Sequence, residues 1–335
     1  MIFPNHWGTT ISALLLFLAG PFIFAGLIGR TKAVFAGKRG PSILQPLRDF
    51  TRLMKKQTII SSCASLISQI AHPIILASSM AAALVTPAFF GQSLISFQGD
   101  FLFLACVLAC GRFMLLAAAM DSGSCFQGMG ASREACFSMI LEPCYIFIMA
   151  AMVCLGASSI PSVSASNSTM PLYQTLSAIA ASPETIKSTG LVFSILAWTA
   201  LFIMLTMEGA RVPVDDPATH LELTMIHEVM ILDTSGPDLA MTSYSTNLRM
   251  LILAALGSNI LLSGLKTIFL GFNNPIMATI AFLMGIIMTA LAVGTVESAL
   301  SRLRMTHLPQ YILFMVPLGV IILAAAILMK GGILQ

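Results

Sequence analysis

The chain has 335 residues, of which 57% are hydrophobic and 9% charged, and its mean hydropathy is +0.91. Soluble domains are about 25% charged, so this composition excludes an ordinary water-soluble protein. The net charge of +3 indicates no class of partner until the charges are placed along the chain. We predict an all-α integral membrane protein.

Apolar runs of about 20 residues recur along the chain, and each is long enough to cross a hydrocarbon core as a helix. The predicted spans are 8–29, 66–88, 101–120, 136–156, 190–210, 247–270, 276–296 and 309–329. Membrane strands are about half as long and alternate in polarity, which excludes a barrel. The first run lacks a basic segment before it and a small-residue cleavage site after it, so we expect a retained helix. These features predict one polytopic domain over residues 1–335.

The basic residues fall mainly on one side of the predicted topology. An even number of spans places both termini together, and with the termini outside, the outer loops and tail keep only Lys187, Lys266 and Lys330. Inner loops of membrane proteins carry the excess of Lys and Arg. The chain is therefore predicted to have both termini outside the membrane.

The first inner segment, residues 30–65, contains a fixed turn followed by an amphipathic pattern. Arg39, Gly40 and Pro41 form the turn signal. After Pro46, apolar residues recur at helical spacing with bases between them, at Leu47, Phe50, Leu53 and Met54. This pattern favours a helix lying at the membrane surface, and the alternative is a basic loop that only fixes topology.

Two charged residues fall inside predicted spans. Arg112 cannot lose its charge in the membrane, so it needs an acid nearby; Asp100, Asp121 and acids of other helices are candidates. Glu142, followed by Pro143, is an intramembrane acid and hence a functional hypothesis. Between these spans, Ser132 is a predicted N-cap, with Glu134 in the first turn of the next helix.

The stretch from Glu208 to Gly236 holds six of the fourteen acids and two of the five histidines. A helix is predicted from about residue 218 to 232, with His220 and His227 on one face. Two histidines without a third convergent ligand favour a proton path or a docking surface over a metal site.

The seven cysteines include no Cys-x-x-Cys pair and no run typical of a ferredoxin. This spacing disfavours an intrinsic iron–sulfur cluster or zinc site. We interpret the cysteines as small buried hydrophobic residues.

The polar segments together resemble one family. The matching segments are Arg39-Gly40-Pro41 with Leu44-Gln45-Pro46 and Asp49, Gly130 to Glu134 with Glu142-Pro143, Glu208 to Asp215 with His220-x-Glu222, and Glu297 to Pro309. They resemble the complex I membrane subunit that seats the peripheral arm, and its counterpart in membrane-bound [NiFe] hydrogenases. The run from Pro217 to Glu228 is similar to the branch of formate hydrogenlyase and hydrogenase-4, and Gly29 stands where complex I homologues have an acid.

The resemblance implies a subunit without redox centres in the cytoplasmic membrane of a bacterium or archaeon. The expected partners are hydrogenase-like large and small subunits, an Fe–S subunit on the cytoplasmic side, and antiporter-like membrane subunits, with no nucleic acid. The Ni–Fe centre and Fe–S clusters belong to those partners, this chain binds no cofactor or metal, and Gly29 weakens a quinone site.

We therefore predict that the chain anchors the soluble arm and couples it to ion translocation. The predicted charge path comprises Glu142, Glu208, Glu222, Glu228, Arg112, Arg211 and Asp215. The predicted docking residues are Arg39, Gly40, Pro41, Gln45, Asp49, Arg133, Glu134, His220, His227, Glu297, Arg302 and Arg304. A purely structural anchor, a complex I type quinone-site subunit and a stand-alone transporter remain as alternatives, and we expect no catalytic centre in this chain alone.

Overall fold

A computed structural model describes residues 7–61, 63–89, 93–158, 171–172, 174–176, 184–215, 225–266, 275–301, 303 and 307–330. The long helices are α1 (Trp7–Phe35), α3 (Leu66–Val85), α4 (Asp100–Asp121), α5 (Cys125–Ser158), α7 (Glu184–Glu208), α9 (Gly236–Lys266), α10 (Pro275–Ala299) and α12 (Met315–Lys330). The short helices are α2 (Gln45–Met54), α8 (His227–Met230) and α11 (Leu308–Leu313). The described residues contain no strand, and the all-α prediction is confirmed.

Eight helical segments in these ranges are long and apolar enough to cross a membrane, with α11 and α12 together forming the last. Four helices extend at one end by six residues or more beyond their predicted spans: α1 continues to Phe35, α5 begins at Cys125, α7 begins at Glu184 and α9 begins at Gly236. The added turns are polar, yet their backbone hydrogen bonds continue. Hydropathy alone therefore underestimates the length of these helices.

The predicted cap at Ser132 is wrong. Ser132 lies inside α5, where its hydroxyl donates to the carbonyl of Met129 at 2.9 Å. A serine within a helix commonly bonds back to the preceding turn in this way, so the residue type alone did not fix the start of the helix.

The predicted helix from 218 to 232 is shorter in its described part. Residues 216–224 lie outside the described residues, and between residues 225 and 232 only α8 is helical. The Asp215 carboxylate accepts hydrogen bonds from the backbone N–H groups of Ile226 and His227, at 2.9 and 3.2 Å. An acid that satisfies free N–H groups in this way fixes the start of a helix at α8.

The interpretation of the cysteines as buried residues is also wrong for most of them. Only Cys144 is buried and Cys154 is partly buried. The exposed ones are Cys63, Cys106, Cys110, Cys125 and Cys136. An apolar sequence in a membrane helix serves lipid contact as well as the protein core, so it does not predict burial within the protein.

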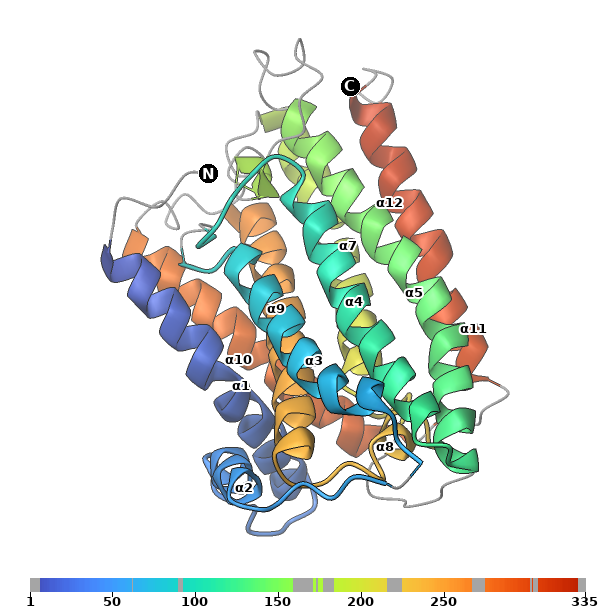
Figure 1. Ribbon diagram of the computed structural model, residues 1–335. Helices are drawn as coiled ribbons and strands as arrows, with labels where there is room; N and C mark the ends of the chain where they lie inside the picture. The colour runs from blue at the N-terminus through green and yellow to red at the C-terminus, as the bar shows by residue number, and fades with distance from the viewer. Residues whose placement is uncertain are drawn as a thin grey trace.

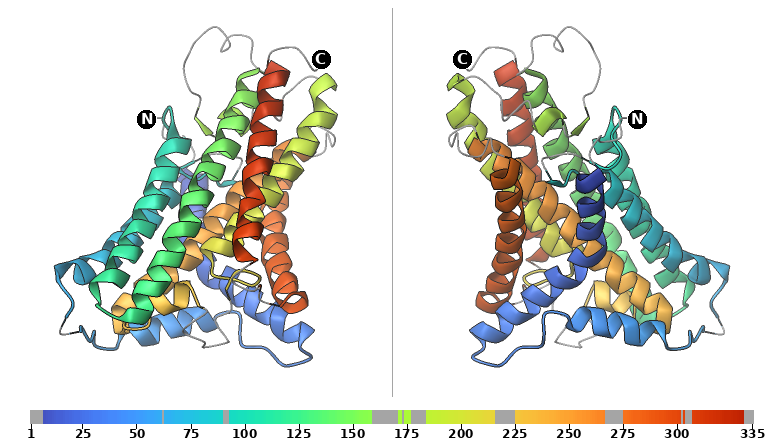
Figure 2. Two further views of the ribbon diagram at one scale, coloured as in Figure 1. Left: turned by 90° about the vertical axis from the view of Figure 1, so that its right-hand side faces the viewer. Right: turned by 90° about the vertical axis from the view of Figure 1, so that its left-hand side faces the viewer.

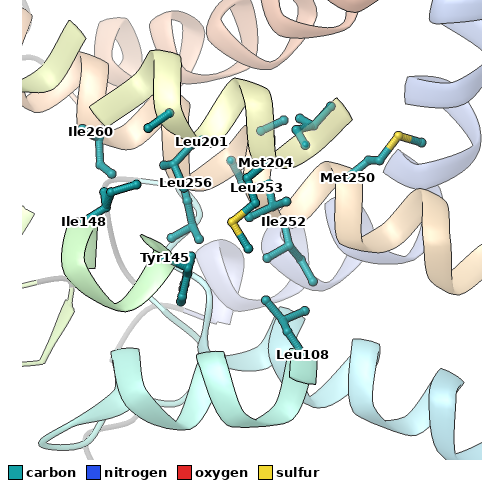
Figure 3. Packing of buried hydrophobic residues seen from close by; sticks show 14 of the residues in the cluster. Leu108, Tyr145, Ile148, Leu201, Met204, Met250, Ile252, Leu253, Leu256 and Ile260 are labelled. Carbon is teal, nitrogen blue, oxygen red and sulfur yellow. The ribbon is translucent and has the colours of Figure 1, made fainter. Parts of the chain in front are cut away.

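Helix α9 is the centre of the bundle and contacts α1, α2, α3, α7 and α10. In its most apolar part 89% of the residues are buried, whereas the share is 28–56% in the other seven spans. Figure 3 shows Leu253 and Leu256 of α9 near Leu201 of α7 and Tyr145 of α5. Polar residues on α9 are therefore shielded from lipid by the protein's own helices.

The start of α1 and the end of α12 lie at one end of the bundle, and α2 and α8 lie at the other (Figure 1). Figure 2 shows α2 lying across the direction of the long helices. Its Phe50 ring contacts Phe22 of α1 and Tyr244 of α9, with ring centroids 5.5 and 5.7 Å apart. The predicted amphipathic helix is present, and this aromatic cluster attaches it to the bundle.

Candidate functional site

A buried arginine gathers three carboxylates between the helices. Arg112 of α4 is 3% exposed, and its Nη1 donates to Glu142 of α5 at 2.8 Å. Its Nη2 donates to Glu208 at the end of α7, and its Nε lies 3.9 Å from a carboxylate oxygen of Glu134. Arg112 therefore joins acids from two other helices inside the bundle.

A second buried cation, Arg249 of α9, completes this group. Its Nη1 lies 3.7 Å from the Glu208 carboxylate, so Glu208 stands between two arginines. We refer to Arg112, Glu134, Glu142, Glu208 and Arg249 as the charge cluster. A charge buried in a membrane protein is costly unless it is paired, and the cluster provides that pairing.

Gly111 gives Arg249 room to reach the charge cluster. A Cβ atom at Gly111 would overlap the Arg249 guanidinium and the Ser78 hydroxyl. The missing side chain on α4 thus lets the arginine pass between α3 and α4.

The charge cluster can hold a proton. If every group were ionised, three carboxylates would face two guanidiniums, leaving one net negative charge. Arginine keeps its charge, so any neutralisation occurs on a carboxylate. Glu134 and Glu208 are buried, whereas the Glu142 side chain is 42% exposed on the side of the bundle. The cluster thus links the interior to the flank of α5.

Asp100 and Asp121 are not the partners of Arg112. The Asp100 carboxylate accepts from the Leu172 backbone N–H at 2.9 and 3.0 Å. The Asp121 carboxylate accepts from the backbone N–H groups of Ser65 and Ser68 at the start of α3. Both acids lie near the ends of α4, too far along the helix to reach its middle.

Glu297 forms a second ionic group at the end of the bundle near α2. Its buried carboxylate lies 3.2 Å from Lys32 Nζ and 3.5 Å from Arg211 Nη1. Nearby, the Leu303 backbone N–H donates to the Pro213 carbonyl at 3.0 Å. The ends of α1 and α10 are joined here to the segment that follows α7. Arg211 belongs to this group and not to the charge cluster.

His227 connects α8 with α9. Its Nε2 lies 3.4 Å from the Thr246 hydroxyl, and Glu228 follows it on α8. Desolvation by burial, together with the positive charge of Arg249, lowers the pKa of His227 to about 4. The ring is therefore neutral at pH 7. Arg133 of α5 holds the same segment, because its Nη1 donates to the Met225 carbonyl at 3.0 Å.

Several predicted docking residues are exposed at the same end of the bundle. Arg39, Gly40 and Pro41 are exposed, and Gln45 on α2 donates to Asp49 at 3.1 Å. Glu134 and Glu297, predicted as docking residues, are instead buried, so their carboxylates organise the interior and do not reach the surface.

His220, Glu222, Arg302 and Arg304 lie outside the described residues. Within the described ranges, no group of three or more His, Cys, Asp or Glu side chains is arranged to hold a metal ion.

Arg249 was not predicted as a site residue from the sequence, and Glu134 was predicted only as a docking residue. Arg249 falls within the predicted span 247–270, where a cation in an apolar run signals a buried partner. Glu134 carried no comparable signal, because it stands near the polar end of a run and its burial depends on how α5 packs on α4.

Comparison with known proteins identifies the family. A family model described as NADH dehydrogenase matches residues 9–327. The chain belongs to this family. It is 27% identical over 245 residues to Hydrogenase-4 component C of Escherichia coli (strain K12), covering 73% of this chain and 71% of that protein. It is 21% identical over 301 residues to Formate hydrogenlyase subunit 4 of the same organism, covering 90% and 92%.

The fold of this family member also matches a solved structure, the membrane-bound sulfane sulfur reductase (MBS), described as an archaeal respiratory membrane complex. The TM-score is 0.67 at 20% identity, and the match covers 96% of this chain and 99% of the other. The resemblance to the complex I and hydrogenase subunits is confirmed, and the chain is a multi-pass membrane protein.

Proposed function

We propose that this chain is the membrane-anchoring, charge-coupling subunit of a complex-I-like, hydrogenase-related oxidoreductase complex. The observation that carries the proposal is the charge cluster, which places three carboxylates around Arg112 inside a membrane bundle. Desolvation favours the neutral form of a carboxylate and a neighbouring arginine favours the ionised form, so a nearby change of charge can shift the balance between the two. The subunit thereby couples events at a soluble redox arm to proton movement.

The exposed side of Glu142 indicates where charge leaves the subunit. Glu142 lies midway along α5, about one turn after the exposed Met139. A carboxylate facing lipid at this depth is unfavourable, so a polar neighbour belongs against it. We assign this flank to an antiporter-like membrane subunit that receives the proton or its electrostatic effect.

The soluble arm is assigned to the end of the bundle that carries α2 and α8. The exposed Arg39 turn and the bases of α2 form the surface for hydrogenase-like large and small subunits and an Fe–S subunit. Those partners hold the Ni–Fe centre and the clusters. Because this end is basic, we place it in the cytoplasm of a bacterium or archaeon, with the termini on the other side.

Proton translocation in membrane vesicles that contain the assembled complex tests the proposal. The variants are Glu142→Gln and Glu208→Gln, with protons moved per hydrogen formed or consumed as the readout. Each is expected to lower this ratio several-fold, because an amide cannot exchange a proton. Unchanged ratios in both variants would refute the role of the charge cluster.

Glu297→Gln provides the matched control, since it neutralises a buried glutamate outside the charge cluster. We expect it to reduce the amount of assembled complex while each assembled complex keeps its proton ratio. A purely structural anchor predicts this same result for Glu142→Gln and Glu208→Gln, so the three variants separate the two functions.

A cavity supports a quinone-binding function as the second candidate. Its volume is about 270 Å³, and it is lined by Phe22, Phe50 and Tyr244 together with Arg211 and Asn247. Ligand pockets combine aromatic walls with a few polar groups, as here, although this volume suits a headgroup better than a long ligand. Binding of ubiquinone-1 by the purified complex that is lost in Ala25→Phe, which fills the cavity, would support this candidate.

A further inference from the structure

A small polar cavity opens beside α8, at the same end of the bundle as α2. Its volume is about 50 Å³, and its lining includes Ser68, His72, Gln127, Asp233 and Asp238. A cavity needs roughly 10–15 Å³ of such space for each water, so this one holds a few waters. The lining carries two carboxylates and an imidazole, which attract and exchange protons.

Gln127 is a buried lining residue whose side-chain amide lacks a hydrogen-bond partner in the described part of the chain. The residue is 1% exposed, and the atom concerned is its Nε2. Buried amide donors are almost always satisfied, and in a polar cavity water is the usual partner. Gln127 therefore indicates that the cavity is hydrated.

His72 connects the cavity with the interior of the bundle. This side chain of α3 is 4% exposed, lines the cavity, and places Nδ1 2.9 Å from the Thr242 hydroxyl of α9. Because Thr242 holds Nδ1, the other ring nitrogen is available to cavity water. An imidazole held in this way can accept a proton on one nitrogen and release one from the other.

A polar stripe on α9 continues from this point. Asp238, Thr242, Thr246 and Arg249 follow one another at spacings of four, four and three residues, so they share a face. The stripe spans about 17 Å along the helix. Thr246 contacts His227 at 3.4 Å, and Arg249 pairs with Glu208 of the charge cluster at 3.7 Å. Nε and Nη2 of Arg249 also have no hydrogen-bond partner among the described residues.

We infer that the cavity, His72 and the α9 stripe form a hydrated proton-uptake path from the end of the bundle near α8 to the charge cluster. This inference rests on the proposed function, because it supplies the protons that the charge cluster exchanges. Unsatisfied buried donors stand at both ends of the path, on Gln127 and on Arg249, and water satisfies both.

The Thr242 hydroxyl donates to the Asp238 carbonyl at 2.8 Å, so Nδ1–H of His72 donates to Thr242 and Nε2 is left to accept from cavity water. In one transfer Nε2 takes a proton from cavity water, Nδ1–H passes its proton to the Thr242 oxygen, and the Thr242 hydroxyl proton leaves to the next water. The ring stays neutral with its proton moved from Nδ1 to Nε2, and a return to the Nδ1–H tautomer precedes the next transfer.

Side chains one turn apart on a helix lie about 5–6 Å apart at Cβ, a gap that one bridging water spans between Thr242 and Thr246. Arg249 has no acceptor and holds water next to Glu208, where the proton arrives.

Thiol accessibility tests whether the path is hydrated without any measurement of activity. Gln127→Cys and Ala82→Cys each place a thiol at a buried position of the assembled complex, in the cavity and in the hydrophobic core respectively. Iodoacetate is charged and reaches thiols only through water, and mass spectrometry locates the labelled cysteines. We expect labelling at position 127 to be faster by about tenfold or more. Equal rates at the two positions would overturn the hydrated cavity.

Proton translocation tests the path itself, with His72→Phe and Thr242→Val as the variants. Thr289→Val is the matched control, because Thr289 is also buried and its hydroxyl donates only to the carbonyl three residues earlier. The expected result is a several-fold lower proton ratio in the two path variants and an unchanged ratio in the control. Normal ratios in both path variants would overturn the path.

Glu208→Gln separates this inference from the function on which it rests. If Glu208→Gln lowers the proton ratio while His72→Phe and Thr242→Val do not, the charge cluster stands and the path is wrong. If Glu142→Gln and Glu208→Gln both have no effect, the proposed function itself fails, and labelling at position 127 still reports whether the cavity is hydrated.

Discussion

Arg112 and Arg249 bring two permanent positive charges to a region that contains three carboxylates. The need of Arg112 for acids followed from the sequence, because a cation in an apolar run must be paired. Which acids pair with it did not follow, because that depends on how α4 packs against α5 and α7. The sequence predicted a charge path that includes Arg112, Glu142 and Glu208, and the structure places both glutamates beside Arg112, whereas Asp100 and Asp121 bond elsewhere.

Replacing Arg249 tests the balance of the charge cluster. Arg249→Met removes one of the two cations beside Glu208, leaving more uncompensated negative charge in the bundle. Loss of one partner from a buried ionic pair costs about 3–5 kcal/mol, so we expect a lower melting temperature in detergent. Arg249→Lys retains the charge and should lose less, and Arg249→Met combined with Glu208→Gln should recover part of the loss. Equal melting temperatures for all three variants would contradict the pairing.

His227 gives the protein a dependence on pH. Its pKa is about 4 in the folded chain against about 6.5 when unfolded. As the pH falls, the unfolded chain therefore binds this proton before the folded chain does. The free energy of unfolding is unaffected by this histidine above pH 6.5 and decreases as the pH falls toward 4, by up to about 3 kcal/mol. Melting temperatures between pH 7.5 and 4.5 should fall less steeply in His227→Gln than in the unchanged protein. Parallel curves would show that this histidine does not contribute.

At the scale of the helices, the sequence predicted the presence of each membrane span better than the residues at which the helices begin and end. The eight spans followed from the length of the apolar runs, whereas the starts of α5 and α9 lie in polar segments that hydropathy does not recognise as helical. The segment before α8 shows why the start of a helix was difficult to predict from the sequence. Its helix begins where Asp215 satisfies the backbone, a contact between residues about a dozen positions apart that periodicity does not encode.

The position of the Arg249 side chain beside α4 depends on Gly111. A methyl group there displaces the Arg249 guanidinium, so Gly111→Ala should cost about 1–3 kcal/mol, as overpacking does in other cores. Gly128 of α5 is the matched control, because nothing lies within 4 Å of a Cβ atom built there. In that helix Gly128→Ala should stabilise the protein by about 0.5–1 kcal/mol. The opposite order of melting temperatures would refute the close approach at Gly111.

At the scale of the whole molecule, the two ends of the bundle differ in charge, which the loop pattern predicted. The start of α1 and the end of α12 lie at the same end of the bundle, opposite to α2 (Figure 1). The joining of these segments through Glu297 was not predictable, because it needs the relative positions of α1 and α10. The candidate site is thus partly a property of the complete bundle.

The orientation of the chain can be tested directly. Because the basic loops are expected in the cytoplasm, a C-terminal alkaline phosphatase fusion should be active and a C-terminal green fluorescent protein fusion should remain dark. The same reporters inserted after Lys56, in the loop between α2 and α3, should give the opposite pattern. An active phosphatase at the loop position would reverse the topology and the side proposed for the soluble arm.

The central position of α9 has a consequence for biogenesis. This helix carries Arg249 and the polar stripe, so it is poorly suited to partition alone from the translocon into lipid. Its neighbours α1, α3 and α7 are synthesised before it, and α10 is synthesised after it. The earlier helices can therefore receive α9 as it leaves the ribosome, and insertion of this span becomes a step of tertiary folding.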